Sequence, residues 1–171
     1  MSKEAWAAVL LAFALVAGIW AGRYFSAVQR IRRASERIVE MTRKGQDESP
    51  MAIALASSRF GKEIAVDAVL ELEPHGEIAR GRQEIVQLFA QIRSQFARIV
   101  FEYASYIIEN KGQGEVAVRV GVRYRFESGP GSAQTGTGTA DLTWRKRDKG
   151  WQIERAAIRD ESGNVEKGMA P

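Results

Sequence analysis

The alternation of hydrophobic and polar positions divides the chain into helical and extended segments. Hydrophobic residues recur every three to four positions across Ser26–Lys44, which predicts an amphipathic helix. Ser49 and Pro50 are typical of an N-cap and a first helical position, so a second helix is expected there. The predicted helices are Ser26–Lys44, Pro50 to near Gly61, and a third that starts after Gly81 and ends at about Phe96.

From Arg98 onward the hydrophobic positions follow a period of two. Valine and aromatic residues alternate along Glu115–Phe126 with Ala, Gly and Arg, a pattern typical of a strand with one buried face. The Gly-rich segments NKGQG and SGPGS and the segment RDKG are expected to be turns, as is the polar stretch EPHGEIARG. The predicted strands are Ala65–Leu72, Arg98–Glu109, Glu115–Phe126, Thr135–Arg147 and Trp151–Arg159.

This order of elements predicts an α+β domain with three helices packed on one face of an antiparallel sheet. We divide the chain into an N-terminal anchor at 1–25, the α+β domain at 26–160 and a polar C-terminal tail at 161–171.

The segment DAVLELEPHGEIARGRQEIVQLF resembles the central signature of the nuclear transport factor 2-like (NTF2-like) superfamily, which includes SnoaL-like cyclases and ketosteroid isomerase. The matching parts are the strand Asp67–Glu71 and the helix start Gly81–Ile85, and GWQI at Gly150–Ile153 is similar to the family's last strand pair. The resemblance implies a cone-shaped sheet with a pocket between helices and sheet. It does not fix the activity, because this fold carries enzymes, transport adaptors and structural subunits.

An uncharged apolar stretch, Ala5–Gly22, precedes the predicted domain. As a helix it would extend roughly 27 Å, close to the hydrocarbon thickness of a bilayer. A cleaved signal peptide is the alternative, but the arginines follow the apolar stretch, which favours an uncleaved transmembrane helix. The residues expected to contact lipid are Trp6, Leu10, Leu11, Phe13, Leu15, Val16, Ile19 and Trp20.

The net charge of +4 is concentrated directly after this stretch. Segment 23–46 holds seven Lys and Arg against two Glu, whereas acidic residues slightly outnumber basic ones from Asp47 onward. The positive-inside rule therefore predicts an outside N-terminus and a cytoplasmic domain, as in a bacterial inner-membrane protein. The residues expected to act as this topology signal or to contact lipid headgroups are Arg23, Arg30, Arg32 and Arg33.

The composition limits the kinds of reactive or binding site that the chain can carry. The chain has no cysteine and one histidine, so we expect no disulfide, no thiolate nucleophile, no multi-histidine metal centre and no bound cofactor. Because the basic charge is confined to one segment, nucleic-acid binding is not expected.

The resemblance also suggests candidate catalytic residues. In the isomerase-like members a carboxylate acts as the general base while a Tyr and a protonated Asp polarise the substrate carbonyl. Glu73 falls near the base and Asp141 near the Asp, but Arg37 stands where the Tyr is expected. His75 is a further candidate base. The alternative is that all three candidates are ordinary surface residues, and the incomplete set favours binding over catalysis.

Arginines project from one face of the predicted sheet. Arginine is common at protein interfaces because its planar guanidinium pairs with carboxylates and stacks on aromatic rings. The alternative is a solvated face balanced by Glu115, Glu127 and Glu154. The candidate interface residues are Arg119, Arg123, Arg125, Arg145, Arg147 and Arg155.

Two functions are therefore expected from the sequence. The first is an accessory or scaffold subunit that binds other membrane-protein subunits, or a second copy of itself through the sheet face, without catalysis. The second is a SnoaL-like or isomerase-like enzyme or binding protein for a small hydrophobic ligand at the membrane surface, with a buried carboxylate in an apolar pocket.

Overall fold

The structure, a computed structural model, describes residues 22, 27–46 and 48–161. Within them, a helix over 27–42 precedes all the other elements. The elements that follow are α2 (Pro50–Glu63), β1 (Ile64–Glu73), β2 (Gly76–Arg80), α3 (Arg82–Gln95), β3 (Arg98–Gly112), β4 (Glu115–Gly129), β5 (Ser132–Arg147) and β6 (Gly150–Asp160).

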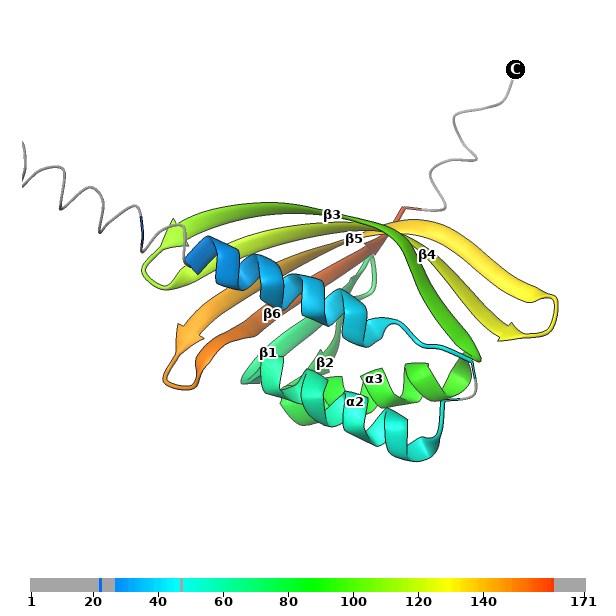
Figure 1. Cartoon of the computed structure of the whole chain (residues 1–171). Coiled ribbons are helices and arrows are strands. Elements are labelled where there is room, and N and C mark those ends of the chain that lie inside the picture. Colours follow the sequence, from blue (N-terminus) through cyan, green and yellow to red (C-terminus); the bar gives the residue numbers. More distant parts are fainter. Residues whose placement is uncertain (1–21, 23–26, 47, 162–171) are drawn as a thin grey trace, which may run out of the picture.

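The six strands form one curved sheet in the order β2-β1-β6-β5-β4-β3. The helix over 27–42 crosses one face of this sheet, and α2 and α3 lie together below it (Figure 1). We call the face covered by the helices the inner face and the opposite one the outer sheet face. The predicted α+β class, with three helices on a curved sheet, is confirmed for the described residues.

Two features of the sheet differ from the prediction. The segment Gly76–Arg80, expected within a turn, forms the edge strand β2 and pairs with Val69–Leu72. The expectation of a purely antiparallel sheet was wrong, because β1 pairs with β6 in parallel. A hairpin, a helix and three strands separate β1 from β6, and a connection of this length permits parallel pairing.

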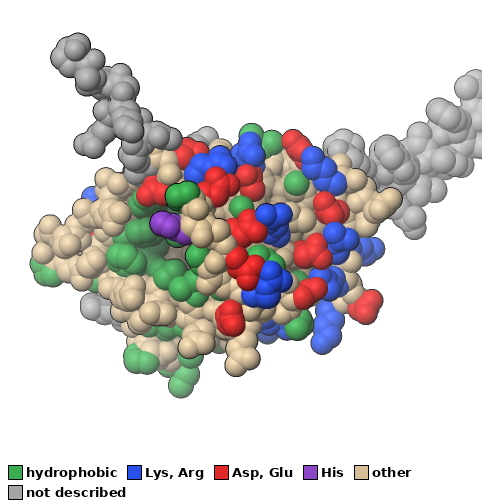
Figure 2. All heavy atoms as spheres, turned by 180° about the vertical axis from the view of Figure 1, so that it is seen from behind, with side chains coloured by type: hydrophobic (Ala, Val, Ile, Leu, Met, Phe, Trp, Pro, Cys, Tyr) green, Lys and Arg blue, Asp and Glu red, His purple; other side chains and the backbone are tan. Residues whose placement is uncertain are grey.

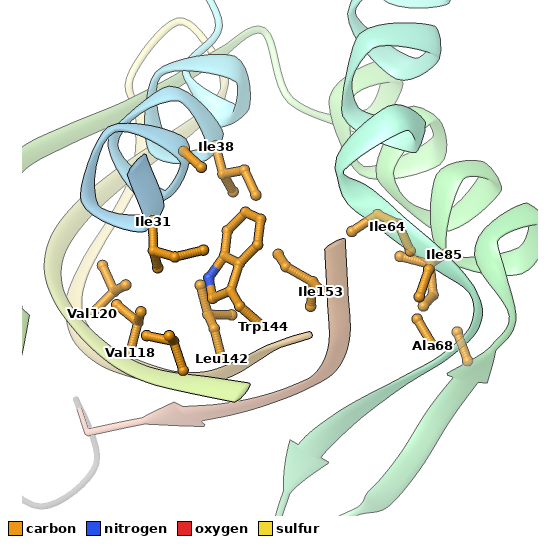
Figure 3. Close-up of a cluster of buried hydrophobic side chains, with 14 residues drawn as sticks. Ile31, Ile38, Ile64, Ala68, Ile85, Val118, Val120, Leu142, Trp144 and Ile153 are labelled. Carbon is orange, nitrogen blue, oxygen red and sulfur yellow. The ribbon is translucent and has the colours of Figure 1, made fainter. Parts of the chain in front are cut away.

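The core lies between the helix over 27–42 and the inner face. Trp144 of β5 is completely buried, and its indole points toward Ile31 and Ile38 of the helix (Figure 3). Alternation along β4 places Val116, Val118 and Val120 in the same core. At ~25 cal/mol per Å² of apolar surface, this burial is the main driving force for docking the helix on the sheet.

The helix start predicted at Ser49 is confirmed, since the Ser49 hydroxyl accepts a hydrogen bond from the Ala52 N–H at 3.2 Å. The predicted anchor, with Arg23, lies outside the described residues apart from Gly22. In the part of the chain that the structure describes, no helix is long and apolar enough to cross a membrane. Arg30, Arg32 and Arg33 lie on the exposed side of the first helix, where Arg32 pairs with Glu36 at 3.1 Å.

Candidate functional site

The outer sheet face is a mosaic of arginines and carboxylates (Figure 2). It arises from the period-two alternation of the strands. In β4, Val118 and Val120 are buried, whereas Arg119, which lies between them, and Arg123, which follows them, are exposed. The same alternation in β1, β5 and β6 turns charged side chains outward. The candidate interface residues predicted from the sequence therefore gather on this one face.

Two ion pairs join neighbouring strands at register positions. Arg119 of β4 and Asp141 of β5 are register partners, and the guanidinium donates to both carboxylate oxygens at 2.7 and 3.1 Å. Arg159 of β6 and Glu73 of β1 are also register partners, with Nε to Oε2 at 2.6 Å. Such cross-strand pairs hold long arginine side chains in defined orientations.

A branched network occupies the neighbouring part of the face. Arg145 contacts Glu115 at 2.9 Å and Glu154 at 2.7 Å, and Glu154 also contacts Arg147 at 2.9 Å. Arg147 reaches Asp67 of β1 at 2.9 Å, so the network crosses four strands. Arg155 pairs separately with Glu71 at 2.7 Å, and Arg125 with Glu127 at 2.9 Å.

The face is close to electrically neutral. Its arginines are Arg119, Arg123, Arg125, Arg145, Arg147, Arg155 and Arg159, and its carboxylates are Asp67, Glu71, Glu73, Glu115, Glu127, Asp141 and Glu154. Arg123 is the one arginine of this set with no carboxylate within 4.0 Å among the described residues. Balanced charge gives little attraction for polyanions, which bind surfaces with an excess of positive charge.

The two predicted catalytic carboxylates lie on the outer sheet face rather than in the core. Side-chain exposure is 47% for Glu73 and 44% for Asp141, and each pairs with an arginine. The hydrogen bond from Arg159 lowers the pKa of Glu73 below its ordinary value of 4.5. A general base in an apolar pocket has a raised pKa instead, because burial disfavours its charged form.

The third predicted catalytic residue, His75, is exposed in the turn between β1 and β2. Figure 2 shows hydrophobic side chains around a hollow beside this histidine, the only one in the sequence. Ile158, 38% exposed, is the register partner of Leu72 in this region of the sheet. Among the described residues, neither of the other two predicted catalytic residues pairs with His75, since Asp141 pairs with Arg119 and Glu73 with Arg159.

The sequence predicted six of the seven arginines on this face. It did not predict Arg159 there or the pairing of arginines with the carboxylates of β1, of which Glu73 was expected only as a catalytic base. Arg159 follows Arg155 by four residues in the same strand, a spacing that places both on one face. Their partners Glu71 and Glu73 lie more than 80 residues earlier in the chain. The three balancing glutamates expected from the sequence do form ion pairs, with Arg125, Arg145 and Arg147.

Among the described residues, no group of three or more His, Cys, Asp and Glu side chains is arranged to hold a metal ion.

The chain matches no protein-family model and no curated protein sequence. Solved structures are similar at the level of the fold. An NTF2-like protein from Pseudomonas putida has a TM-score of 0.58 and 16% identity, covering 79% of this chain and 87% of that one. For hexachlorocyclohexane dehydrochlorinase LinA-type3 from Novosphingobium barchaimii the TM-score is 0.58 and the identity 13%, covering 80% and 90% of the two chains.

A third structure is an NTF2-like protein with a cystatin-like fold from Novosphingobium aromaticivorans, with a TM-score of 0.54, 16% identity and coverage of 81% and 89%. The fold of the described domain is therefore NTF2-like, as the resemblance of Asp67–Phe89 implied. At this level of identity the likeness establishes the fold and not an activity.

Proposed function

We propose that this protein is a membrane-anchored NTF2-like subunit that binds another protein through its outer sheet face and has no catalytic activity of its own. The observation that carries the proposal is the charge-balanced mosaic of ion pairs across β1, β4, β5 and β6. Its arginines are already oriented by carboxylates, so a partner would bind them with little loss of side-chain entropy.

Charge balance favours a protein partner over a nucleic acid or a lipid surface. A protein can present its own carboxylates and arginines in register with the mosaic, which gives complementarity without net charge. Arg123 is the expected centre of such a contact because it is exposed and has no carboxylate partner in the described chain. A second copy of the chain is the simplest partner of this kind, and a larger complex is the other.

The filled core supports a role without catalysis. Trp144, Ile31 and Leu142 occupy the space between the first helix and the inner face (Figure 3), and the two candidate carboxylates lie outside it. The apolar stretch Ala5–Gly22 would hold the domain at the membrane, with the N-terminus outside and the domain in the cytoplasm.

The test is to extract the full chain with a mild detergent and to identify its stable partners by size separation and mass spectrometry. Arg123→Glu should release the partner while leaving the unfolding midpoint of the subunit unchanged. The matched control is Arg59→Glu on the exposed side of α2. A wild-type chain that migrates as a monomer at all concentrations, with no co-purifying protein, would contradict the proposal.

A double substitution separates binding from folding. Exchanging Arg119 and Asp141 (Arg119→Asp with Asp141→Arg) keeps an ion pair between the two strands but inverts the charge pattern presented to a partner. We expect unchanged stability and lost partner binding. Retained binding by this variant would exclude this part of the face from the interface.

A small hydrophobic ligand is the second candidate function, favoured by the hollow with hydrophobic side chains beside His75 (Figure 2). Native mass spectrometry of the purified chain tests it. A retained lipid-like molecule, released by Ile158→Asp and not by Ile107→Asp, would support this function; both positions are exposed isoleucines.

A further inference from the structure

The strand β3 has a free edge. It is one of the two end strands of the sheet, and Figure 1 shows it along the border opposite to β2. This edge is covered near its start, where Lys44 and Ile99 exchange backbone hydrogen bonds at 2.9 and 3.1 Å. Arg43 also donates to the Phe101 carbonyl at 3.0 Å. Among the described residues, no other residue outside β3 and β4 hydrogen-bonds to the β3 backbone, so the edge of the stretch 104–110 has no partner strand.

The register of β3 identifies which backbone groups of this stretch point away from β4. Residues of an antiparallel strand alternate between those that bond to the neighbouring strand and those that point away from it. Ile99 points away, because its N–H and C=O bond to Lys44. The bulge between Phe101 and Tyr103 adds one residue and shifts this alternation from odd to even positions. The residues whose N–H and C=O groups point to the free edge are therefore Ala104, Tyr106, Ile108 and Asn110.

The stretch 104–110 carries few of the features that protect exposed edges. Proteins commonly shorten their edge strands or place charges and proline on them. The other edge strand, β2, is only five residues long and carries Glu77 and Arg80. By contrast, the stretch 104–110 has the sequence ASYIIEN, with a single charge and no proline. Its Ile107 side chain is 59% exposed. Such an edge favours pairing with another strand.

The backbone of this stretch can pair with a second copy of itself in antiparallel orientation. Ile107 lies at its midpoint, and a two-fold axis there places every outward-pointing residue opposite another one. Ala104 would pair with Asn110 of the second copy, and Tyr106 with Ile108. An axis at any other residue would pair fewer of the four, so the backbone alone favours the axis at Ile107.

The side chains favour the same register. At positions between the hydrogen-bonded pairs, where side chains of neighbouring strands lie closest, Ile107 would face its own copy and Ser105 would face Glu109. The isoleucine pair would remove two exposed apolar side chains from water, and the Ser105 hydroxyl can donate to the Glu109 carboxylate. An axis at Glu109 would instead bring two carboxylates together. Hydrophobic contact and charge therefore agree with the backbone.

We propose that two copies of this chain pair through β3, antiparallel and with the two-fold axis at Ile107, to form one continuous sheet. Paired residues project to the same side of a sheet, so both first helices would cover the same side of the joined sheet. This contact goes beyond the proposed function, because it uses the β3 edge and not the ion pairs of the outer sheet face. Either proposal can therefore fail without the other.

Cysteine cross-linking of the full chain in mild detergent tests the register directly, because the chain contains no cysteine. Opposite residues at a non-hydrogen-bonded position have Cα atoms about 4.5 Å apart, within the range of a disulfide. We expect Ile107→Cys to form a covalent dimer on oxidation with copper phenanthroline at least tenfold faster than Glu109→Cys. The two copies of position 109 would lie about 14 Å apart along the strands, at ~3.4 Å per residue. Val66→Cys, at an exposed position of β1, measures the rate of random collision.

The second measurement is sedimentation of the detergent-solubilised chain over a range of concentrations. Wild type should form dimers, and Ile107→Glu should raise the dissociation constant at least tenfold, because the introduced carboxylate would meet its own copy and Glu109. In the single subunit this carboxylate lies opposite Arg119, the register partner in β4, so the unfolding midpoint measured below the dissociation constant should not fall. Val66→Glu, which adds the same charge away from β3, should leave the dimer unchanged.

Three outcomes would overturn the proposal: equal cross-linking rates of Ile107→Cys and Glu109→Cys, a dimer that Ile107→Glu leaves intact, or a monomer at all concentrations. Arg123→Glu distinguishes this contact from the proposed interface. A dimer that is lost in Arg123→Glu but kept in Ile107→Glu would place the contact on the outer sheet face. If Ile107→Glu fails to fold, the cross-linking rates decide, since Ile107→Cys introduces no charge.

Discussion

Arg93 of α3 forms a buried two-point ion pair with Glu48, which lies just before α2. The Arg93 side chain is 4% exposed, and its Nε and Nη2 atoms donate to the two carboxylate oxygens of Glu48. Its Nη1 donates to the carbonyls of Met41 and Arg43 at 2.6 and 2.9 Å. One guanidinium thus ties the end of the first helix and the following loop to α3.

The first prediction concerns this guanidinium. Arg93→Ala would leave Glu48 and two backbone carbonyls without their donor in a buried site. Removing one partner of a buried ion pair typically costs about 3–5 kcal/mol. We expect a loss of this size in the free energy of unfolding, measured by denaturant titration of the full chain in detergent.

The control for Arg93→Ala is Arg59→Ala on the exposed side of α2, for which we expect a change within about 0.5 kcal/mol. Arg93→Lys should fall between the two, because lysine keeps the charge but cannot donate to three acceptors in one plane. Equal stability of Arg93→Ala and Arg59→Ala would show that the buried pair is not important for the fold.

The second prediction concerns Trp144. Trp144→Ala would open a cavity between the first helix and the inner face, and such substitutions cost about 3–5 kcal/mol. Unfolding followed by far-ultraviolet circular dichroism measures the change. Ile107→Ala is the control, because this side chain is 59% exposed on the edge strand β3. A loss below about 1 kcal/mol for Trp144→Ala would contradict a tightly packed core.

Local patterns predicted most of the fold. The Ser49 cap, the helical periodicity and the alternation along β4 are properties of neighbouring residues, and the structure agrees with each of them. The strand β2 was missed because Gly76 and the charged residues of Gly76–Arg80 are typical of a turn. In the structure this segment instead pairs with β1 as an antiparallel strand.

The candidate site depended on strand order, which local patterns do not encode. The arginines of β4 and β5 were predicted on one face by alternation alone. The pairing of Arg155 with Glu71 and of Arg159 with Glu73 follows from the parallel contact of β6 with β1. No spacing in the sequence indicates that these two strands are neighbours.

The third prediction concerns Gly138 of β5. A Cβ atom there would lie 3.0 Å from the backbone carbonyl oxygen of Arg159 in the neighbouring strand. Because a backbone atom in a paired strand cannot move alone, we expect Gly138→Ala to cost about 1–3 kcal/mol, as overpacking typically does. Gly121→Ala is the comparison. Its Cβ would lie 2.8 Å from the Ser105 hydroxyl oxygen, and the double variant Gly121→Ala/Ser105→Ala removes this contact.

The comparison makes the cause testable. Rescue of Gly121→Ala by Ser105→Ala, together with a persistent loss in Gly138→Ala, would identify backbone crowding as the origin of the cost. A Gly138→Ala variant as stable as wild type would show that β5 and β6 can separate slightly without loss of pairing.

The fourth prediction concerns the pH dependence of stability through Glu73. Its folded pKa is lowered by the hydrogen bond from Arg159, relative to an ordinary value of 4.5 in the unfolded chain. Below pH 4.5 the unfolded state therefore takes up the proton first, so the contribution of Glu73 is complete above pH 4.5 and is lost as the pH falls through the lowered folded pKa. Asp67, whose pKa is lowered by a backbone hydrogen bond and by Arg147, adds to the same loss.

We therefore expect wild-type stability to decline below about pH 4.5 and Glu73→Gln to decline less steeply, with a small loss at pH 7 because the pair is exposed. Unfolding midpoints between pH 3 and pH 7 measure both slopes. Glu102→Gln, at an exposed position of β3 outside the ion-pair mosaic, should leave the wild-type slope unchanged.

Since the proposed interface includes the Arg159–Glu73 pair, partner binding should weaken over the same pH range. Parallel pH profiles for wild type and Glu73→Gln would mean that Arg159 is held by contacts other than Glu73.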